Sequence, residues 1–386
     1  MRKLLGLLLT LSLMLSGCGW MDGSYVHISD HRDQGPPVQE QILAASSYLE
    51  LENVLSQMVR SGTSEGLIYL YDYAQNTAES GMYVVSRWLT TTDPVGAYAV
   101  SDVEYEIGSN SGKPAIAVRI NYRHTPMEIQ QINEVKNIKA AEEAVGYALE
   151  ALKPGIVLLI EEYESVDFVQ MAADYAQSHP QIVMEAPQVT EAVYGTDASR
   201  IVELNMTYRS SRDSLKLMRQ QVEPVFEAAR LYVSDDAPIL QQYAQLYSFL
   251  MERFDYRIQP SITPSYSLLH HGVGDSNAFA IVYQAMCRSV DLDCRVITGT
   301  RDGEPWTWNL IDLGGYYGHV DLLQNSAANG FHVMNAQEMQ GYVWDYSAAP
   351  SNSMPEDAED AMGSEASAAA DGPASAEDSG KSQNNP

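Results

Sequence analysis

Residues 303–321 have the sequence GEPWTWNLIDLGGYYGHVD, the stretch that decides the fold of the second half of the chain. Apolar and aromatic residues are dense in WTWNLIDL and again in YYGHVDLL, and two adjacent glycines separate the two runs. Short apolar runs on either side of a Gly-Gly pair are typical of a β-hairpin. The sequence therefore predicts two consecutive strands here.

The segment before this hairpin adds a helix and a third strand. Residues 277–289 form an apolar run after GVGDS, a sequence that favours a helix start with Asp275 or Ser276 as the N-cap. The run CRVITG follows as a strand, and the turn TRDGEP leads into the hairpin. Farther upstream, residues 237–258 have the spacing of an amphipathic helix, and the residues between the two helices are expected to form a loop.

Four short motifs in this segment, SNAFA, RVITG, WTWN and GHVD, resemble the core of the transglutaminase-like superfamily of papain-type thiol enzymes. The resemblance covers about 85 residues. It implies a papain-type domain at residues 230–348 and, in an active member, a Cys-His-Asp triad. Here the nucleophile position holds Ser276, the base position holds Trp306, and only Asp321 is kept. The resemblance therefore implies a degenerate triad.

The two substitutions remove the groups that carry the chemistry. A thiolate at a helix N-terminus is stabilised by the helix dipole and by a neighbouring imidazolium, whereas a serine hydroxyl depends more on an adjacent base. Losing the thiol and the base together removes the catalytic unit. We therefore expect no catalytic residue at Ser276, Trp306 or Asp321, and no enzyme activity.

The alternative is an active serine-nucleophile amide hydrolase or transferase, in which a relocated histidine activates Ser276. Three histidines are candidates for that base: His270, His271 and His319. The first two lie a few residues before Ser276, in the expected loop, and His319 shares a strand face with Asp321. In the family that this segment resembles, a histidine at the position of His319 does not serve as the base.

Trp306 has a structural interpretation in the same resemblance. An indole N–H is a donor only, so Trp306 beside Asp321 would satisfy the carboxylate while its ring fills the cleft. This predicts a blocked or aromatic-lined groove. The candidates for ligand binding are therefore Trp306, Trp308, Tyr316 and Tyr317.

The first half of the chain carries an internal repeat. A helix, a strand, a second helix and two hairpin strands are expected at residues 38–133 and again at 134–225. Gly66 and Gly155 are 89 residues apart, and the Tyr-Arg pairs that begin at Tyr122 and Tyr208 are 86 residues apart. Near-equal offsets indicate a duplication. The predicted fold class is α+β: two repeated small α/β sandwich units, followed by a transglutaminase-like (papain-type) α+β domain.

Three segments of these units have a clear local pattern. Residues 38–61 have mostly helical spacing and end at Gly62, and residues 134–152 also have helical spacing. The sequence GAYAVSDVEYEIG, residues 96–108, alternates apolar and polar residues as a strand does.

The two ends of the chain differ in composition from the rest. Residues 1–17 combine a basic start, MRK, with an apolar run that is short for a membrane span. The sequence LSGC at residues 15–18 resembles the bacterial lipobox, which implies cleavage before Cys18, a lipid on its sulfur, and export; a plain secretory signal is the alternative. Residues 18–37 are expected to form a tether, and the small, acidic residues 349–386 a disordered tail.

Composition excludes some classes of function. The chain has 386 residues and a formal charge of −28, which argues against nucleic-acid binding because phosphate recognition needs a basic face. Besides Cys18, only Cys287 and Cys294 are present, without the spacing of a redox or zinc site. We expect two separate buried thiols, with a disulfide as the alternative in an exported protein. No metal or cofactor is expected.

Taken together, these features predict a lipid-anchored protein on the extracellular face of the cell membrane. Its transglutaminase-like domain would be a catalytically inactive module that binds peptide, peptidoglycan or an envelope partner. The membrane itself would be a partner through lipidated Cys18. The alternatives are the serine enzyme described above and a scaffold that only presents surface.

Overall fold

The computed structural model describes residues 43–196, 198–327, 330–335 and 337–345. The expected export signal (1–17), lipid-attachment residue Cys18, tether (18–37) and acidic tail (349–386) lie outside these residues. Within the described part of the chain, no helix has both the length and the apolar composition needed to cross a membrane.

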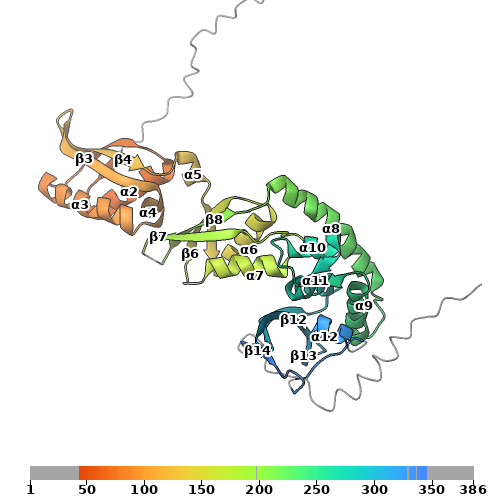
Figure 1. Cartoon of the computed structure of the whole chain (residues 1–386). Helices are drawn as coiled ribbons and strands as arrows, with labels where there is room; N and C mark the ends of the chain where they lie inside the picture. Colours follow the sequence, from red (N-terminus) through yellow and green to blue (C-terminus); the bar gives the residue numbers. More distant parts are fainter. Residues whose placement is uncertain (1–42, 197, 328–329, 336, 346–386) are drawn as a thin grey trace, which may run out of the picture. The chain divides into compact units, whose positions relative to one another are not determined.

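The first unit is a four-stranded sheet with helices on one face (Figure 1). Along β4, Ile116, Val118 and Ile120 are buried while Ala117 and Arg119 are exposed, so one face is covered and the other meets solvent. Its elements are β1 (Leu43–Ala45), α2 (Tyr48–Ser61), β2 (Glu65–Leu70), α3 (Gln75–Thr91), α4 (Pro94–Ala99), β3 (Val100–Asn110) and β4 (Lys113–Tyr122), with strand order β1-β2-β4-β3.

The second unit repeats this plan after a short helix, α5 (Pro126–Gln130). Its elements are β5 (Asn133–Asn137), α6 (Ile138–Glu150), β6 (Gly155–Glu162), α7 (Phe168–Ser178), β7 (Gln188–Tyr194) and β8 (Arg200–Thr207), with strand order β5-β6-β8-β7. In each unit the last strand along the chain lies between the second and the third. Gly66 and Gly155 occupy the starts of the equivalent strands β2 and β6. The predicted α+β class with repeated units is confirmed.

Two short strands were missing from the sequence prediction. β1 precedes α2, and β5 precedes α6, in segments where the helical spacing continued without a break. The side chains of Ser47 and Asn137 accept hydrogen bonds from the backbone N–H groups of Glu50 (3.3 Å) and Ala140 (3.1 Å), and so fix where each helix begins. Gly62 ends α2 as expected, with a left-handed φ of 69°.

Residues 96–99 form a helix where a strand was expected. Asp93 is the N-cap of α4, its Oδ1 accepting from Gly96 N at 2.6 Å, and Pro94 occupies the first turn. A Cβ at Gly96 would lie 2.2 Å from the carbonyl oxygen of Leu89, so only glycine allows this close approach. The strand β3 begins at Val100.

In the last unit, helices pack against another four-stranded sheet (Figure 1). Its strand order is β13-β12-β11-β14. Two two-residue strands, β9 and β10, pair in parallel beside it. Its elements are α8 (Arg212–Tyr232), α9 (Ile239–Met251), β9 (Asp255–Tyr256), α10 (Pro264–His271), β10 (Val273–Gly274), α11 (Ser276–Arg288), β11 (Cys294–Arg301), β12 (Glu304–Asp312), β13 (Tyr317–Val320), α12 (Leu322–Ala327) and β14 (Tyr342–Trp344).

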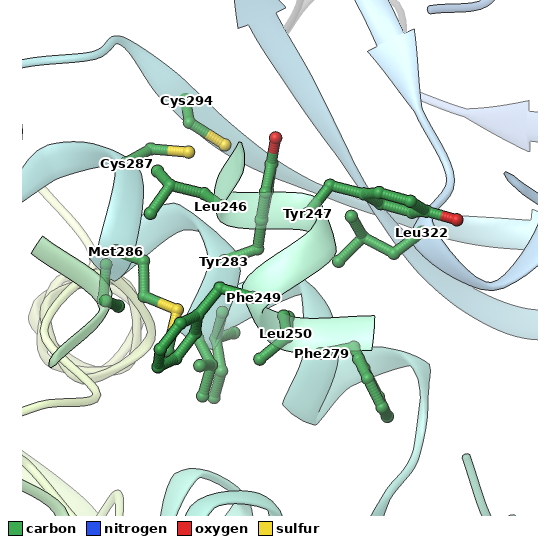
Figure 2. Close-up of a cluster of buried hydrophobic side chains, with 14 of the residues drawn as sticks. Leu246, Tyr247, Phe249, Leu250, Phe279, Tyr283, Met286, Cys287, Cys294 and Leu322 are labelled. Carbon is green, nitrogen blue, oxygen red and sulfur yellow. The ribbon is translucent and has the colours of Figure 1, made fainter. Parts of the chain in front are cut away.

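Helix α11 is the centre of this unit. Every residue from Ala278 to Cys287 is buried, which explains why its sequence is apolar on all sides. Figure 2 shows Phe279, Tyr283 and Met286 of α11 among side chains of α9. Tyr283 donates its hydroxyl to the carbonyl oxygen of Tyr243 at 2.9 Å, so α11 and α9 are joined by a buried hydrogen bond as well as by apolar contact.

One apolar core extends from the second repeat unit into this one. Met184 follows α7, Leu215 and Val222 lie on α8, and all three belong to the same buried cluster as α9 and α11. Helix α8 therefore crosses the boundary expected between residues 225 and 230 without a break.

The two cysteines are free and buried, in agreement with the expectation of separate thiols. Cys287 lies in the last turn of α11 and Cys294 begins β11, and Figure 2 shows their side chains next to one another. Burial, followed by the neighbouring Cys294 thiol, raises the pKa of Cys287 well above its ordinary value, so this thiol is poorly nucleophilic at neutral pH.

Candidate functional site

Ser276 occupies the first turn of α11, where the resemblance places a nucleophile. Asp275 is the N-cap, and its Oδ1 accepts from Ala278 N at 2.9 Å. Just before it, β10 pairs with β9 so that Gly274 lies opposite Tyr256. The start of α11 is therefore fixed by a side-chain cap and by a backbone ladder.

Trp306 and Asp321 meet as the sequence predicted. Trp306 lies near the start of β12, paired with Gly299 of β11, and Asp321 follows the last residue of β13. The indole Nε1 of Trp306 donates to Asp321 Oδ2 at 2.9 Å. The side chains of Trp306 and Asp321 are thus joined by a direct hydrogen bond.

The Asp321 carboxylate is saturated with donors. Its Oδ2 also accepts from Arg301 Nη1 at 3.0 Å and from the Tyr342 hydroxyl. Its Oδ1 accepts from the backbone N–H groups of Leu323 (3.1 Å) and Gln324 (3.3 Å), which makes Asp321 the cap of α12. The residue is only 1% exposed. A carboxylate with five donors has little acceptor capacity left for a further group.

The expected strand at residues 316–323 ends earlier than predicted. Residues 321–323 were expected to continue the strand YYGHVDLL, but β13 ends at Val320 and α12 begins at Leu322. The cause is Asp321 itself, because its carboxylate caps the helix rather than continuing the ladder.

Aromatic rings and one guanidinium surround the hydrogen bond between Trp306 and Asp321. Arg301 Cζ lies 5.3 Å from the ring centroid of Trp306 and 5.6 Å from that of Tyr342. Tyr256 tilts toward Trp306 with ring centroids 5.8 Å apart. Burial, and then the carboxylates of Asp275 and Asp321, raise the pKa of Tyr256. Tyr256 therefore stays a neutral phenol between the start of α11 and Trp306.

The three candidate bases lie elsewhere. His270 and His271 are exposed and end α10 rather than lying in a loop; they contact one another and the ring of Tyr266. Pro264 at the start of α10 and a left-handed Gly272 at its end account for this helix. Among the described residues, Ser276 Oγ makes no hydrogen bond to an imidazole.

His319 is held inside the sheet. Its Nδ1 accepts from Trp308 Nε1 at 3.0 Å, and its ring meets that of Trp344 edge-on at 4.9 Å. The residue is 8% exposed, and burial lowers its pKa from 6.5 to about 4. At neutral pH it is an uncharged imidazole whose Nδ1 lone pair is already used. This geometry gives it no hydrogen bond to Ser276.

The buried imidazole predicts a loss of stability in acid. The unfolded chain binds a proton at His319 below pH 6.5, whereas the folded chain does so only near pH 4. The free energy of unfolding should therefore fall by about 2–3 kcal/mol between about pH 7 and about pH 4.5 through this residue. Urea unfolding across this range would measure the slope. In His319→Gln the free energy of unfolding should fall by about 2–3 kcal/mol less over the same pH range. An equal fall in the two proteins would contradict a lowered pKa of His319.

The structure separates the residues proposed for ligand binding. Trp306 is half-buried at the site, but Trp308 is 1% exposed and belongs to the core between β11, β12 and β14. The expectation that Trp308 contacts a ligand is therefore wrong. Tyr316 and Tyr317 lie at the opposite end of β12, where Tyr317 pairs with Asp312. Asp312 is six positions along β12 from Trp306, a distance of about 20 Å.

Three residues at the site were missed. Tyr256 and Arg301 contact Trp306, and Tyr342 contacts Asp321. Arg301 could have been found, because it is the basic residue of the expected turn TRDGEP, which lies between the strand CRVITG and Trp306. Tyr342 carries no sequence signal, since it lies 21 residues beyond Asp321 in the chain.

No metal site is evident in the part of the chain that the structure describes. No three histidine, cysteine, aspartate or glutamate side chains gather there in a way that could hold an ion.

Comparison with known families assigns this unit. Residues 227–346 match the family model described as the transglutaminase-like superfamily. The chain contains a transglutaminase-like domain. The matched range includes Ser276, Trp306 and Asp321. No curated protein matches the chain.

Solved structures of several proteins show remote likeness. One is described as a TGase, with 8% identity and a TM-score of 0.25, over 51% of this chain and 56% of that one. A proposed cysteine protease from Cytophaga hutchinsonii has 14% identity and a TM-score of 0.24, over 41% of this chain and 70% of that one. A proposed protease from Parabacteroides distasonis has 9% identity and a TM-score of 0.21, over 66% and 39%. The chain thus spans little more than half the length of the first of these.

Proposed function

We propose that the transglutaminase-like domain is a catalytically inactive binding module that recognises peptide or peptidoglycan stem peptide. The observation that carries the proposal is the hydrogen bond from Trp306 Nε1 to Asp321 Oδ2. In the family that this domain resembles, that carboxylate orients the catalytic imidazole. Here it holds an indole, which cannot accept a proton in the neutral pH range.

The surroundings of Ser276 support the same conclusion. A serine hydroxyl needs a general base within about 2.6–3.2 Å, or slightly more without substrate. The described residues provide no imidazole hydrogen-bonded to Ser276 Oγ, and Nδ1 of the buried His319 already accepts a hydrogen bond from Trp308 Nε1. The half-buried ring of Trp306, with Tyr256 and Arg301 beside it, is instead a surface suited to contact with a ligand.

Two assays on the full chain would test this proposal together. Incubation with a fluorophosphonate probe should leave Ser276 unlabelled, because an unactivated serine does not react; a known serine hydrolase is the positive control. Binding of muropeptides, measured by isothermal titration calorimetry, should weaken about tenfold or more in Trp306→Ala.

Trp306→Phe is the matched control for the binding assay. It keeps an aromatic face but loses the N–H that bonds Asp321, so it should retain most of the affinity if the ring is what the ligand contacts. Labelling of Ser276 by the probe would reject the inactive module and support an active serine hydrolase or transferase. Muropeptide affinity equal in the wild type and Trp306→Ala, or no affinity at all, would favour a scaffold.

We also propose that the protein is anchored to the extracellular face of the cell membrane through a lipid on Cys18. The support is the LSGC sequence after a short apolar segment. Cells fed a radioactive fatty acid should incorporate label into the wild-type protein and none into Cys18→Ser. Equal labelling of the two, or label in neither, would reject the lipid anchor.

A further inference from the structure

A hollow lies beside the first turn of α11, where Asn277 is part of its lining. It is a pocket of about 770 Å³ between the second repeat unit and α11. Val183 and Met184 from the segment after α7 line it, as do Ile262 from the loop before α10 and Asn277 and Ile281 from α11. Asn277 directly follows Ser276 at the start of α11.

The walls of this pocket are fixed by buried polar contacts. Ser265 at the start of α10 donates to the carbonyl oxygen of Pro180 at 2.8 Å, which joins the two walls. Glu185 is buried, and its two carboxylate oxygens accept from the backbone N–H groups of Arg209 (2.5 Å) and Ser210 (3.1 Å). A buried carboxylate satisfied in this way holds the segment after α7 in one position.

The chemistry of the lining suits a peptide. Its base is apolar, formed by the buried side chains of Val183, Met184 and Ile281. Asn277 and other amide side chains offer a donor and an acceptor each, as a peptide bond does. Asp174 and Arg209 also line it, with opposite charges, so the pocket has no strong preference for a polyanion.

The lining argues against a sugar chain. Rings of sugars are usually bound against aromatic faces, and none of the described residues that line this pocket is aromatic. The aromatic residues of the site, Trp306 and Tyr256, lie outside it.

One edge of β11 adjoins this pocket through Thr298. Its pairing with β14 covers only Gly299–Arg301, and in the described residues no strand pairs with the outer edge of β11 from Cys294 to Thr298. Thr298 is exposed and lines the pocket. An exposed strand edge presents unpaired N–H and C=O groups that an extended chain can join as a further strand.

We infer that this pocket binds an extended polypeptide segment from a partner, laid along the outer edge of β11 between the second repeat unit and α11. The inference rests on the proposed binding function and deepens it, because it names a peptide main chain as the ligand and assigns the second repeat unit to the site. The segment's backbone pairs with β11, and its apolar side chains contact Val183, Met184 and Ile281.

The test uses twelve-residue peptides selected from a random library on the immobilised full chain. The tightest of them is labelled, and its dissociation constant is measured by fluorescence anisotropy. Ile262→Arg, at the 45% exposed rim of the pocket, should raise this constant about tenfold or more. Ile258→Arg is the matched control, since Ile258 is 82% exposed on the same loop and does not line the pocket; it should leave the constant unchanged.

A second series of peptides, with N-methylated amides, tests whether the peptide backbone pairs with β11. N-methylation of alternate amides of the peptide should abolish binding, while N-methylation of the intervening amides should be tolerated, because successive residues of an edge-pairing strand point their N–H groups in opposite directions. Uniform sensitivity, equal constants for Ile262→Arg and Ile258→Arg, or failure to select any binding peptide would overturn the inference. Muropeptide binding and its loss in Trp306→Ala would still decide the proposed function separately.

The chain's own C-terminal segment is the competing occupant. If a variant ending at Asp345 binds the selected peptide about tenfold more tightly than the full chain, the segment after Asp345 covers the edge, and the partner peptide is overturned as the natural occupant. Equal affinity of the two chains supports the partner peptide.

Discussion

Replacing Asp321 by alanine is expected to lower the free energy of unfolding by about 3–5 kcal/mol. The carboxylate is buried and accepts from Arg301, Trp306 and Tyr342 on one oxygen and caps α12 with the other. Its removal leaves three donors facing one empty position and the guanidinium without its partner. Arg301 retains 29% exposure of its side chain, which places the expected loss toward the lower end.

Urea unfolding of the full chain would measure this loss. Asp321→Asn should lose less, because its remaining side-chain oxygen can still accept from the backbone of α12. Asp293→Ala is the control: Asp293 pairs with Arg295 at 3.3 Å on the surface, with about half of each side chain exposed, and its loss should stay within about 0.5 kcal/mol. A loss below about 1 kcal/mol for Asp321→Ala would show that the three donors do not depend on the carboxylate.

Trp308→Ala is expected to cost about 3–5 kcal/mol, the range for removing a large buried aromatic side chain. Trp308 is packed edge-on against Tyr342 and Trp344, with ring centroids 5.1 and 5.6 Å away. It also lies against Gly299, where a Cβ would approach the ring to 3.0 Å. The alanine would leave a cavity in the small core that joins β14 to the sheet.

Trp308→Phe separates packing from hydrogen bonding. It keeps most of the ring but leaves His319 Nδ1 without its donor, so a smaller loss of about 1–3 kcal/mol is expected. Thermal or urea unfolding measures both variants, with Tyr83→Ala on an exposed position of α3 as the control. If Trp308→Ala were as stable as the control, the burial described for Trp308 would be wrong.

The contrast between Trp306 and Trp308 shows how far the sequence could predict the site. The two tryptophans are two residues apart on one strand and so share a face of the sheet. The sequence indicates that face, but not which ring another segment covers. The cover over Trp308 comes from β14, a three-residue strand far along the chain whose place follows from tertiary contact alone. Trp306 lies nearer the strand start and keeps part of its ring exposed.

Local chemistry explains most of the agreement elsewhere. The start of α11 followed from GVGDS because an aspartate cap is a local signal, and the contact of Trp306 with Asp321 followed from the family resemblance. The strands β1 and β5 were missed because each directly precedes a capped helix and the apolar spacing does not change at the boundary. The pocket beside Asn277 could not be predicted, since its walls come from units that no periodic pattern relates.

Helix α8 has a consequence for how this protein could have been assembled. The family pattern begins at residue 227, inside that helix, while Leu215 and Val222 from its first half are already part of the core around α11. A gene fragment cut where the family pattern begins would sever the helix and strip apolar cover from its own core. The second repeat unit and the domain after it therefore share one core, and a chain break at residue 227 would divide that core.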